Sequence, residues 1–127
     1  MAKRIVITGP ELPHHHQPIP VAVKIGQMVF SSALPGLDAS TQSAPSEPEK
    51  QVELAFQHVR KVIELAGGTT EDIAKVVVYL EDMKYRELVN TDWVKMFPDE
   101  LDRPVRHTVK ADLPSNFIIQ VEMIAVL

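Results

Sequence analysis

Apolar residues recur at helical spacing between residues 46 and 68 of the chain. The set that shares this spacing consists of Val52, Ala55, Phe56, Val59, Val62, Ile63 and Ala66. Ser46 and Glu49 have the spacing of a capping box, and Gly67 with Gly68 can supply a left-handed cap at the other end. The pattern therefore predicts an amphipathic helix whose apolar stripe packs against a sheet or another helix.

Other apolar segments predict strands. Residues 73–80 end in a nearly continuous β-branched run, VVVYL, which is typical of a central strand covered on both faces. Shorter segments predict a strand over residues 3–8, a strand pair over 21–32 that turns at 24–27, and a last strand over 117–127.

A second helix is predicted over residues 83–97, stopped by Pro98. Residues 9–20 and 35–45 are rich in proline or in small polar residues and read as loops. The resulting order, ββ(β)-α-β-α-ββ, predicts an α+β sandwich with two helices on one sheet face. Residues 1–127 are expected to form a single domain.

The amino-acid composition argues against several classes of function. The net charge of −4 and the absence of a Lys/Arg cluster argue against nucleic-acid binding. The chain has no cysteine, which excludes disulfides, thiolate catalysis and zinc–thiolate sites. The apolar run near the N-terminus is too short for a signal peptide, and no segment is expected to span a membrane. The expected location is therefore cytoplasmic or an equivalent matrix.

The segment around Arg106 has the most informative chemistry. Pro104 is typical of the position just before a strand, and alternation then points Arg106, Thr108 and Lys110 to one face. A guanidinium presents a fork of donors that matches a carboxylate with two hydrogen bonds. Arg106 is therefore a candidate anchor for a small carboxylic acid, and the alternative is an arginine in a surface ion pair.

Seven blocks of the chain resemble the Rid (YjgF/RidA) family in order and spacing. They are residues 24–32, 55–68, 76–83, 89–90, 103–106, 111–114 and 121–125. The resemblance runs from about residue 18 to the C-terminus. It implies a chorismate-mutase-like α+β fold, a mixed sheet, and a homotrimer whose sheets form a central β-barrel, with ligand clefts between subunits. It also implies hydrolysis of reactive enamines and imines to 2-keto acids and ammonia. We expect no cofactor and no metal.

The resemblance assigns roles to four residues. Arg106 matches the arginine that binds the substrate carboxylate, and Glu122 matches the glutamate that positions or activates the attacking water. Glu122 has a structural alternative, as a carboxylate hydrogen-bonded within the trimer. Asn90 matches a recurrent asparagine, and the alternative is that its side chain only caps the helix or bridges to a neighbouring loop. Ser31 matches a serine that lines the cleft.

Three further positions of the expected cleft depart from the family. Ile19 stands where active members carry a tyrosine, and isoleucine can neither donate nor accept a hydrogen bond. Ser32 replaces a glycine whose backbone approaches the ligand, and Thr108 replaces a frequent cysteine. The carboxylate anchor is retained while the rest of the cleft is altered.

The resemblance assigns no role to several histidines and aromatic residues. Three adjacent histidines, His14–His16, cannot all face one metal ion. We expect a solvated run, one imidazole that enters the cleft in place of the missing tyrosine, or adventitious metal binding. His107 is expected to pack or to contact another subunit, and His58 to lie on the outer side of its helix. Trp93 and Tyr79 are expected in the core.

Two functions follow, and the enzyme is favoured by a small margin. The first is a hydrolytic deaminase of small enamine or imine carboxylates, for which Arg106 and Glu122 are the evidence. The second is a non-catalytic trimer that binds a small 2-keto acid or related carboxylate, which the loss of the tyrosine favours. Some relatives are labelled ribonucleases, but the acidic charge balance gives that activity no support.

Overall fold

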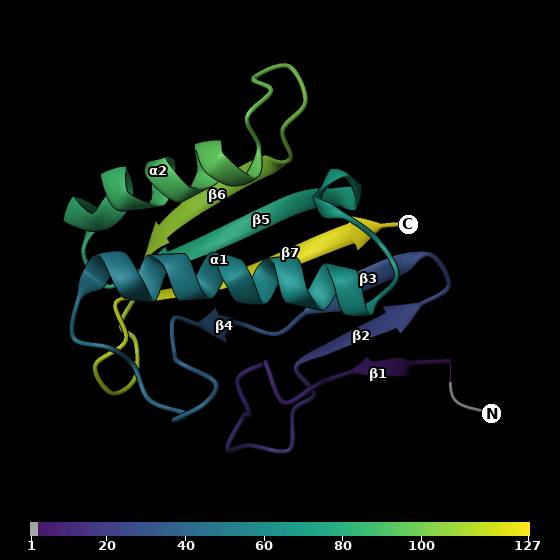
Figure 1. Cartoon of the computed structure of the whole chain (residues 1–127), viewed down its shortest axis with the longest axis horizontal. Coiled ribbons are helices and arrows are strands. Elements are labelled where there is room, and N and C mark those ends of the chain that lie inside the picture. Colours follow the sequence, from purple (N-terminus) through teal and green to yellow (C-terminus); the bar gives the residue numbers. More distant parts are fainter. Residues whose placement is uncertain (1–2) are drawn as a thin grey trace.

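Both long helices lie on the same face of one mixed sheet (Figure 1). The structure is a computed structural model that describes residues 3–127, and within this range seven strands form the sheet. The strands are β1 (Ile5–Ile7), β2 (Ala22–Ile25), β3 (Met28–Ser31), β4 (Leu34–Pro35), β5 (Ile73–Leu80), β6 (Val105–Lys110) and β7 (Ile119–Val126). The helices are α1 (Pro48–Leu65) and α2 (Arg86–Met96), with 3₁₀ turns at Thr70–Asp72 and Met83–Tyr85. The predicted α+β arrangement with two helices on one face is confirmed.

The sheet order is β1-β2-β3-β7-β5-β6, and β4 pairs with β7. β5 lies between β7, to which it is antiparallel, and β6, to which it is parallel. A parallel pair needs a crossover connection, and α2 supplies it between β5 and β6. The last strand pairs with β3 as well, so the C-terminal segment joins the two halves of the sheet.

Helix α1 ends as the sequence predicts but begins differently. The N-cap is Glu47, with Pro48 in the first helical turn, and no side chain caps the helix. The predicted capping box of Ser46 is therefore wrong, because Pro48, whose φ suits the first helical position, starts the helix beyond reach of it. At the C-terminus Gly67 has φ +93°, and Gly68 N–H donates to the Ile63 carbonyl at 2.9 Å. This dihedral angle and this hydrogen bond confirm the left-handed cap.

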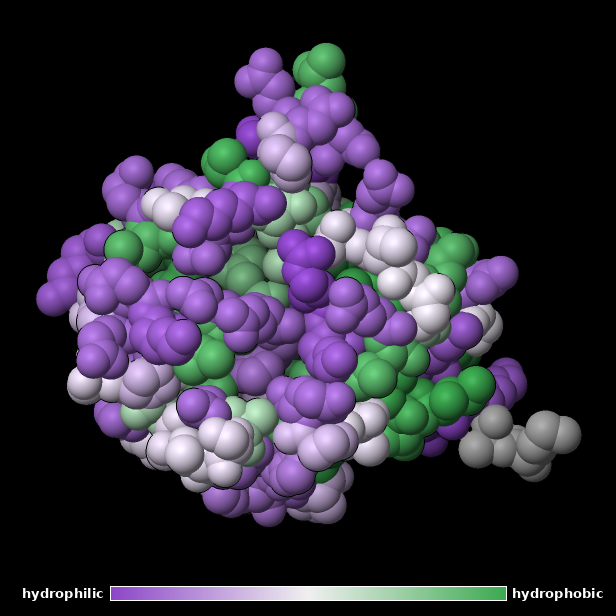
Figure 2. Space-filling model, viewed as in Figure 1, coloured by the Kyte–Doolittle hydropathy of each residue, from purple (hydrophilic) through white to green (hydrophobic). Residues whose placement is uncertain are grey.

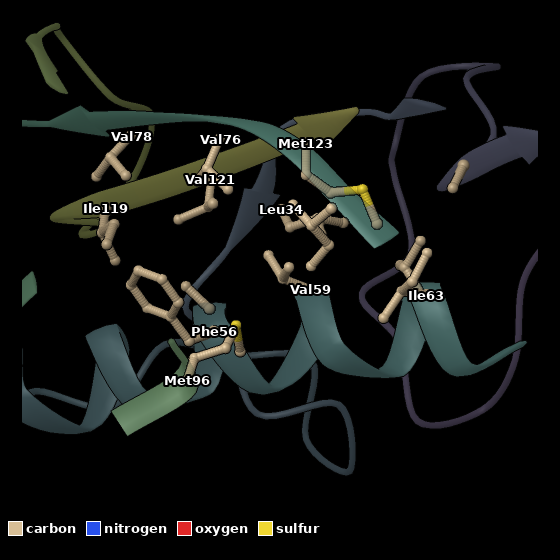
Figure 3. Close-up of a cluster of buried hydrophobic side chains, with 14 of the residues drawn as sticks. Leu34, Phe56, Val59, Ile63, Val76, Val78, Met96, Ile119, Val121 and Met123 are labelled. Carbon is tan, nitrogen blue, oxygen red and sulfur yellow. The ribbon is translucent and has the colours of Figure 1, made fainter. Parts of the chain in front are cut away.

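The apolar stripe of α1 packs on the sheet and forms the core (Figure 3). Phe56, Val59 and Ile63 point from the helix toward the sheet, where Val76 of β5 and Val121 of β7 face the helix, and each of the five is at most 3% exposed. Complete burial of such a side chain contributes about 1.5–3 kcal/mol, so this layer provides much of the stability of the fold. Hydrophilic residues dominate the outer surface of the helical layer (Figure 2).

The sheet face turned away from the helices is hereafter called the open face. On β5 the side chains of Val76, Val78 and Leu80 are buried under the helices, whereas Val77 and Tyr79 on the open face are partly exposed. The expectation that this strand is covered on both faces is therefore wrong for the single chain, since no layer of the described chain covers the open face.

The expectation for His58 also changes. His58 does not lie on the outer side of α1: it is 4% exposed, and its Nε2 donates to the Leu37 carbonyl at 2.7 Å. The loop that follows β4 covers it, which the helical period alone could not reveal. Burial is also the main reason why the pKa of His58 lies below its usual value.

Among the described residues, no helix combines the length and the apolar character that crossing a membrane requires.

Candidate functional site

Arg106 lies on β6 and is held by three side chains on the helical side of the sheet. Its Nε donates to Thr108 Oγ1 at 3.1 Å, and its Nη2 donates to Asn90 Oδ1 of α2 at 2.8 Å. The guanidinium also stacks on the Trp93 ring, with 4.9 Å from Cζ to the ring centroid. These contacts fix the plane and direction of the guanidinium, which prepares it for a bidentate ligand.

The guanidinium retains donors for an anion. Of its five N–H groups, one on Nε and one on Nη2 are used, which leaves one on Nη2 and two on Nη1. Burial lowers the pKa of Arg106, and the nearby charge of Arg86 lowers it further, but a guanidinium remains protonated in proteins. Within residues 3–127 no carboxylate forms an ion pair with Arg106. The group is therefore a half-buried cation suited to an external carboxylate.

Glu122 lies on β7 in a second group of polar residues. The Tyr79 hydroxyl donates to Glu122 Oε1 at 2.8 Å, and this bond is the main reason why the pKa of the phenol is raised. Glu122 lines a cavity of about 240 Å³ together with Ser31 of β3 and Lys75 of β5. The phenol holds one carboxylate oxygen and leaves Oε2 available to a water or ligand.

The two serines use their hydroxyls within the chain. Ser31 Oγ donates to the Ser32 carbonyl at 2.8 Å and accepts from Met123 N–H at 2.9 Å. Ser32 Oγ donates to the Val21 carbonyl at 2.9 Å. Either oxygen can still accept a hydrogen bond, but neither hydroxyl hydrogen is free.

Arg106 and Glu122 lie on opposite faces of the sheet. Arg106 pairs across the sheet with Val76, whose side chain is buried under the helices. Glu122 pairs with Val77, which points to the open face. Side chains directly opposite each other share a face, so these two candidate residues cannot meet within one chain.

Ser32 lines a different cavity, which we call the histidine-lined cavity. It measures about 130 Å³, and its rim includes His14–His16, with Gln120 of β7 also in the lining. Ile19, in the loop between β1 and β2, is 47% exposed and makes no side-chain hydrogen bond by its nature. In the described part of the chain no three His, Asp or Glu side chains are placed to hold a metal ion.

Sequence patterns did not predict Lys75 as a site residue or the contact between Trp93 and Arg106, and they misplaced Tyr79 and His107. Tyr79 is not a core residue, since its hydroxyl reaches Glu122, and Lys75 was not considered at all. Alternation puts Lys75, Val77 and Tyr79 on one face, but the strand register that brings them to Glu122 is not readable from the sequence. Trp93 is buried, as expected, and also supports Arg106. His107 is exposed, so a packing role within the chain is wrong and a subunit contact stays a prediction.

Known proteins resemble the chain over nearly its full length. The family model for endoribonuclease L-PSP matches residues 13–127. A RutC family protein of Aquifex aeolicus is 31% identical over 121 residues, covering 94% of this chain and 97% of the relative. A protein of Dermatophagoides farinae named 2-iminobutanoate/2-iminopropanoate deaminase is 26% identical, covering 100% of this chain and 99% of the relative. The crystal structure of Escherichia coli TdcF with bound serine has a TM-score of 0.89 and 26% identity, covering 97% of this chain and 98% of that one.

Proposed function

The chain belongs to the Rid family, described by the endoribonuclease L-PSP model, and we propose that it is a hydrolytic deaminase of small enamine and imine carboxylates. The products are a 2-keto acid and ammonia. One observation carries the proposal: a pre-oriented guanidinium with no carboxylate partner in residues 3–127, in a chain that also retains Glu122 beside a phenol donor. The deaminase name of a relative supports the same reaction class.

The site is proposed to form between two copies of the chain. Arg106 with Asn90 and Thr108 contributes the half that binds the carboxylate, and Glu122 with Ser31 contributes the half that handles water. The position of these halves on opposite faces of the sheet supports this arrangement, because one chain cannot close the site alone.

The assembly is proposed to be a homotrimer in which the open faces form a central barrel. The open face carries partly exposed apolar side chains, among them Val23, Phe30, Val77 and Ile124. A contiguous apolar sheet face of this kind is normally covered, and further copies of the chain would cover it. Static light scattering at several protein concentrations tests the proposal, and a monomer would remove the site between subunits.

The reaction needs one anchor, one water and proton transfer. Arg106 binds the substrate carboxylate through Nη1 and the remaining Nη2 hydrogen. An enamine first accepts a proton at C3 and becomes the imine, whose protonated nitrogen makes C2 electrophilic. Glu122 takes a proton from water while the oxygen bonds to C2 and the C=N π electrons move to nitrogen.

The resulting 2-amino-2-hydroxy acid then collapses. The proton on Glu122 passes to the nitrogen, the C–N bond breaks, and the hydroxyl oxygen forms the carbonyl as its proton leaves. Tyr79 keeps the Glu122 carboxylate in place through its 2.8 Å hydrogen bond, so it acts as a positioning residue. A phenol supplied by β5 compensates in part for the tyrosine that is absent at Ile19.

A coupled assay tests the proposal. An amino-acid oxidase generates 2-imino acids, and semicarbazide traps the imine that the protein does not hydrolyse. We expect the wild type to reduce the trapped imine, and Arg106→Ala and Glu122→Gln to lose most of this activity. Arg60→Ala, which removes an exposed arginine of α1, serves as the matched control and should behave as wild type.

The alternative is a trimeric binding protein for a small 2-keto acid or related carboxylate. Ile19 and the internally bonded hydroxyls of Ser31 and Ser32 favour it, since they leave fewer groups to move protons. If none of the tested 2-imino acids is hydrolysed and Arg106→Ala abolishes binding of 2-keto acids, the binding function is supported.

A further inference from the structure

We propose that the histidine-lined cavity receives the side chain of the substrate and that this side chain is an aromatic ring. This inference rests on the deaminase function proposed above and specifies its substrate class. The preferred substrate would be a 2-imino acid with an aromatic side chain, such as the imine formed from phenylalanine.

The size and walls of the cavity suit a ring. Its volume is about 130 Å³, near the ~150 Å³ of an apolar protein cavity that binds benzene. Val21, Leu34 and Leu37 line it and are at most 7% exposed, and Phe117 adds an aromatic wall. A methyl or ethyl side chain would leave most of this space unfilled, and the unfilled apolar surface would contribute no binding energy.

The cavity adjoins the group around Glu122. Ser32 in its lining directly follows Ser31, which lines the cavity of Glu122. Gln120, also in its lining, precedes Glu122 by two residues and shares its face of β7. Two residues of a strand span about 6.7 Å, a distance that a benzyl group covers and a methyl group does not. A substrate with C2 at Glu122 can therefore place its C3 substituent in the histidine-lined cavity.

The wall around Phe117 is fixed before a ligand binds. The buried Gln51 side chain accepts from Ile118 N–H at 2.9 Å and donates to the Asn116 carbonyl at 3.0 Å. Phe117 lies between these two anchored residues, so little backbone freedom is lost when a ring packs against its side chain.

The rim adds polar groups of defined type. His15 Nδ1 accepts from Gln17 N–H at 3.0 Å, so the neutral imidazole carries its hydrogen on Nε2, where it can donate. A mostly apolar pocket with a few polar groups at its edge is the usual composition of a small-molecule site. The cavity should therefore bind an aromatic ring with one polar substituent in addition to an unsubstituted phenyl group.

The test compares imines from phenylalanine and alanine in wild type, Ala33→Leu and Ala39→Leu. Ala33 lines the cavity, whereas Ala39, which follows β4, lies outside its lining, so the same substitution there is the matched control. We expect the wild type to have at least about tenfold higher kcat/KM for the phenylalanine imine. Ala33→Leu should reduce that ratio at least about tenfold, and Ala39→Leu should leave it unchanged. If leucine at position 33 prevents folding, Ala33→Val replaces it.

Each other outcome has a defined meaning. A wild type that prefers the alanine imine, or a ratio that folded Ala33→Leu does not change, overturns the aromatic pocket while the deaminase function stands. If no imine is hydrolysed, the deaminase function fails, and calorimetric binding of phenylpyruvate and pyruvate decides the pocket. The aromatic pocket is supported if phenylpyruvate binds more tightly than pyruvate and Ala33→Leu weakens the binding of phenylpyruvate. It is overturned if the two keto acids bind equally, which is the result expected if a side chain of a partner subunit fills the cavity.

Discussion

Gln51 offers the sharpest test of how the loop before β7 is held. The side chain is 2% exposed and makes three hydrogen bonds to backbone groups of two loops. Oε1 accepts from Ile118 N–H at 2.9 Å, and Nε2 donates to the carbonyls of Asn116 and Pro45 at 3.0 Å each. Gln51→Met keeps the length and approximate volume of the side chain but removes all three bonds.

The expected loss of stability follows from these three partners. The Ile118 N–H lies in a buried bond, and leaving such a donor unpaired costs about 1–3 kcal/mol. The two carbonyl bonds are only partly buried, so each contributes about 0.5–1.5 kcal/mol. We therefore expect Gln51→Met to lower the free energy of unfolding by about 4 kcal/mol, the midpoint of the sum of these ranges.

Guanidinium denaturation followed by circular dichroism measures this change. All variants are compared at one protein concentration, since association with further copies would add to apparent stability. Gln57→Met is the matched control: it is an exposed glutamine of the same helix, and the same substitution there should change stability by less than about 0.5 kcal/mol. A loss below about 1 kcal/mol for Gln51→Met would refute the claim that this amide holds the two loops.

Three further predictions concern pH, catalysis and assembly. Burial lowers the pKa of His58, so the imidazole binds a proton more readily in the unfolded chain than in the folded chain. The free energy of unfolding should therefore fall as pH drops below 6.5, by up to about 1.4 kcal/mol per pH unit. Chemical denaturation at several pH values should find that His58→Gln lacks this part of the decrease. Tyr79→Phe should lower kcat for imine hydrolysis about tenfold while KM stays unchanged, because the phenol positions Glu122 and does not bind the substrate. Tyr85→Phe should change neither constant, and equal kcat values for the two variants would contradict the positioning role. Val77→Lys on the open face should dissociate the assembly, which light scattering measures as a lower mass, whereas Val94→Lys on the exposed side of α2 should leave the assembly intact. An unchanged mass for both variants would count against a trimer built on the open face.

Local patterns were sufficient for most of the elements and for one group of the candidate site, but not for the short strand β4, because Pro35 falls in the segment that was predicted to be a loop. The stripe of α1, the span of β5 and the shared face of Arg106 and Thr108 depend on periods of 3.6 and 2 residues, which neighbours in the sequence determine. Ser46 was the local exception, since Pro48 decided where the helix begins.

Contacts between distant residues were decided only by the tertiary structure. Tyr79 meets Glu122 across 43 positions because β5 and β7 pair in one particular register, and His58 is buried because a distant loop folds over α1. The same register places Arg106 and Glu122 on opposite sheet faces. Strand register depends on the packing of the whole core, and a shift of one residue would turn every side chain of a strand to the other face. The sequence therefore determined which chemistry the chain carries, while the sheet pairing decided which groups can act together.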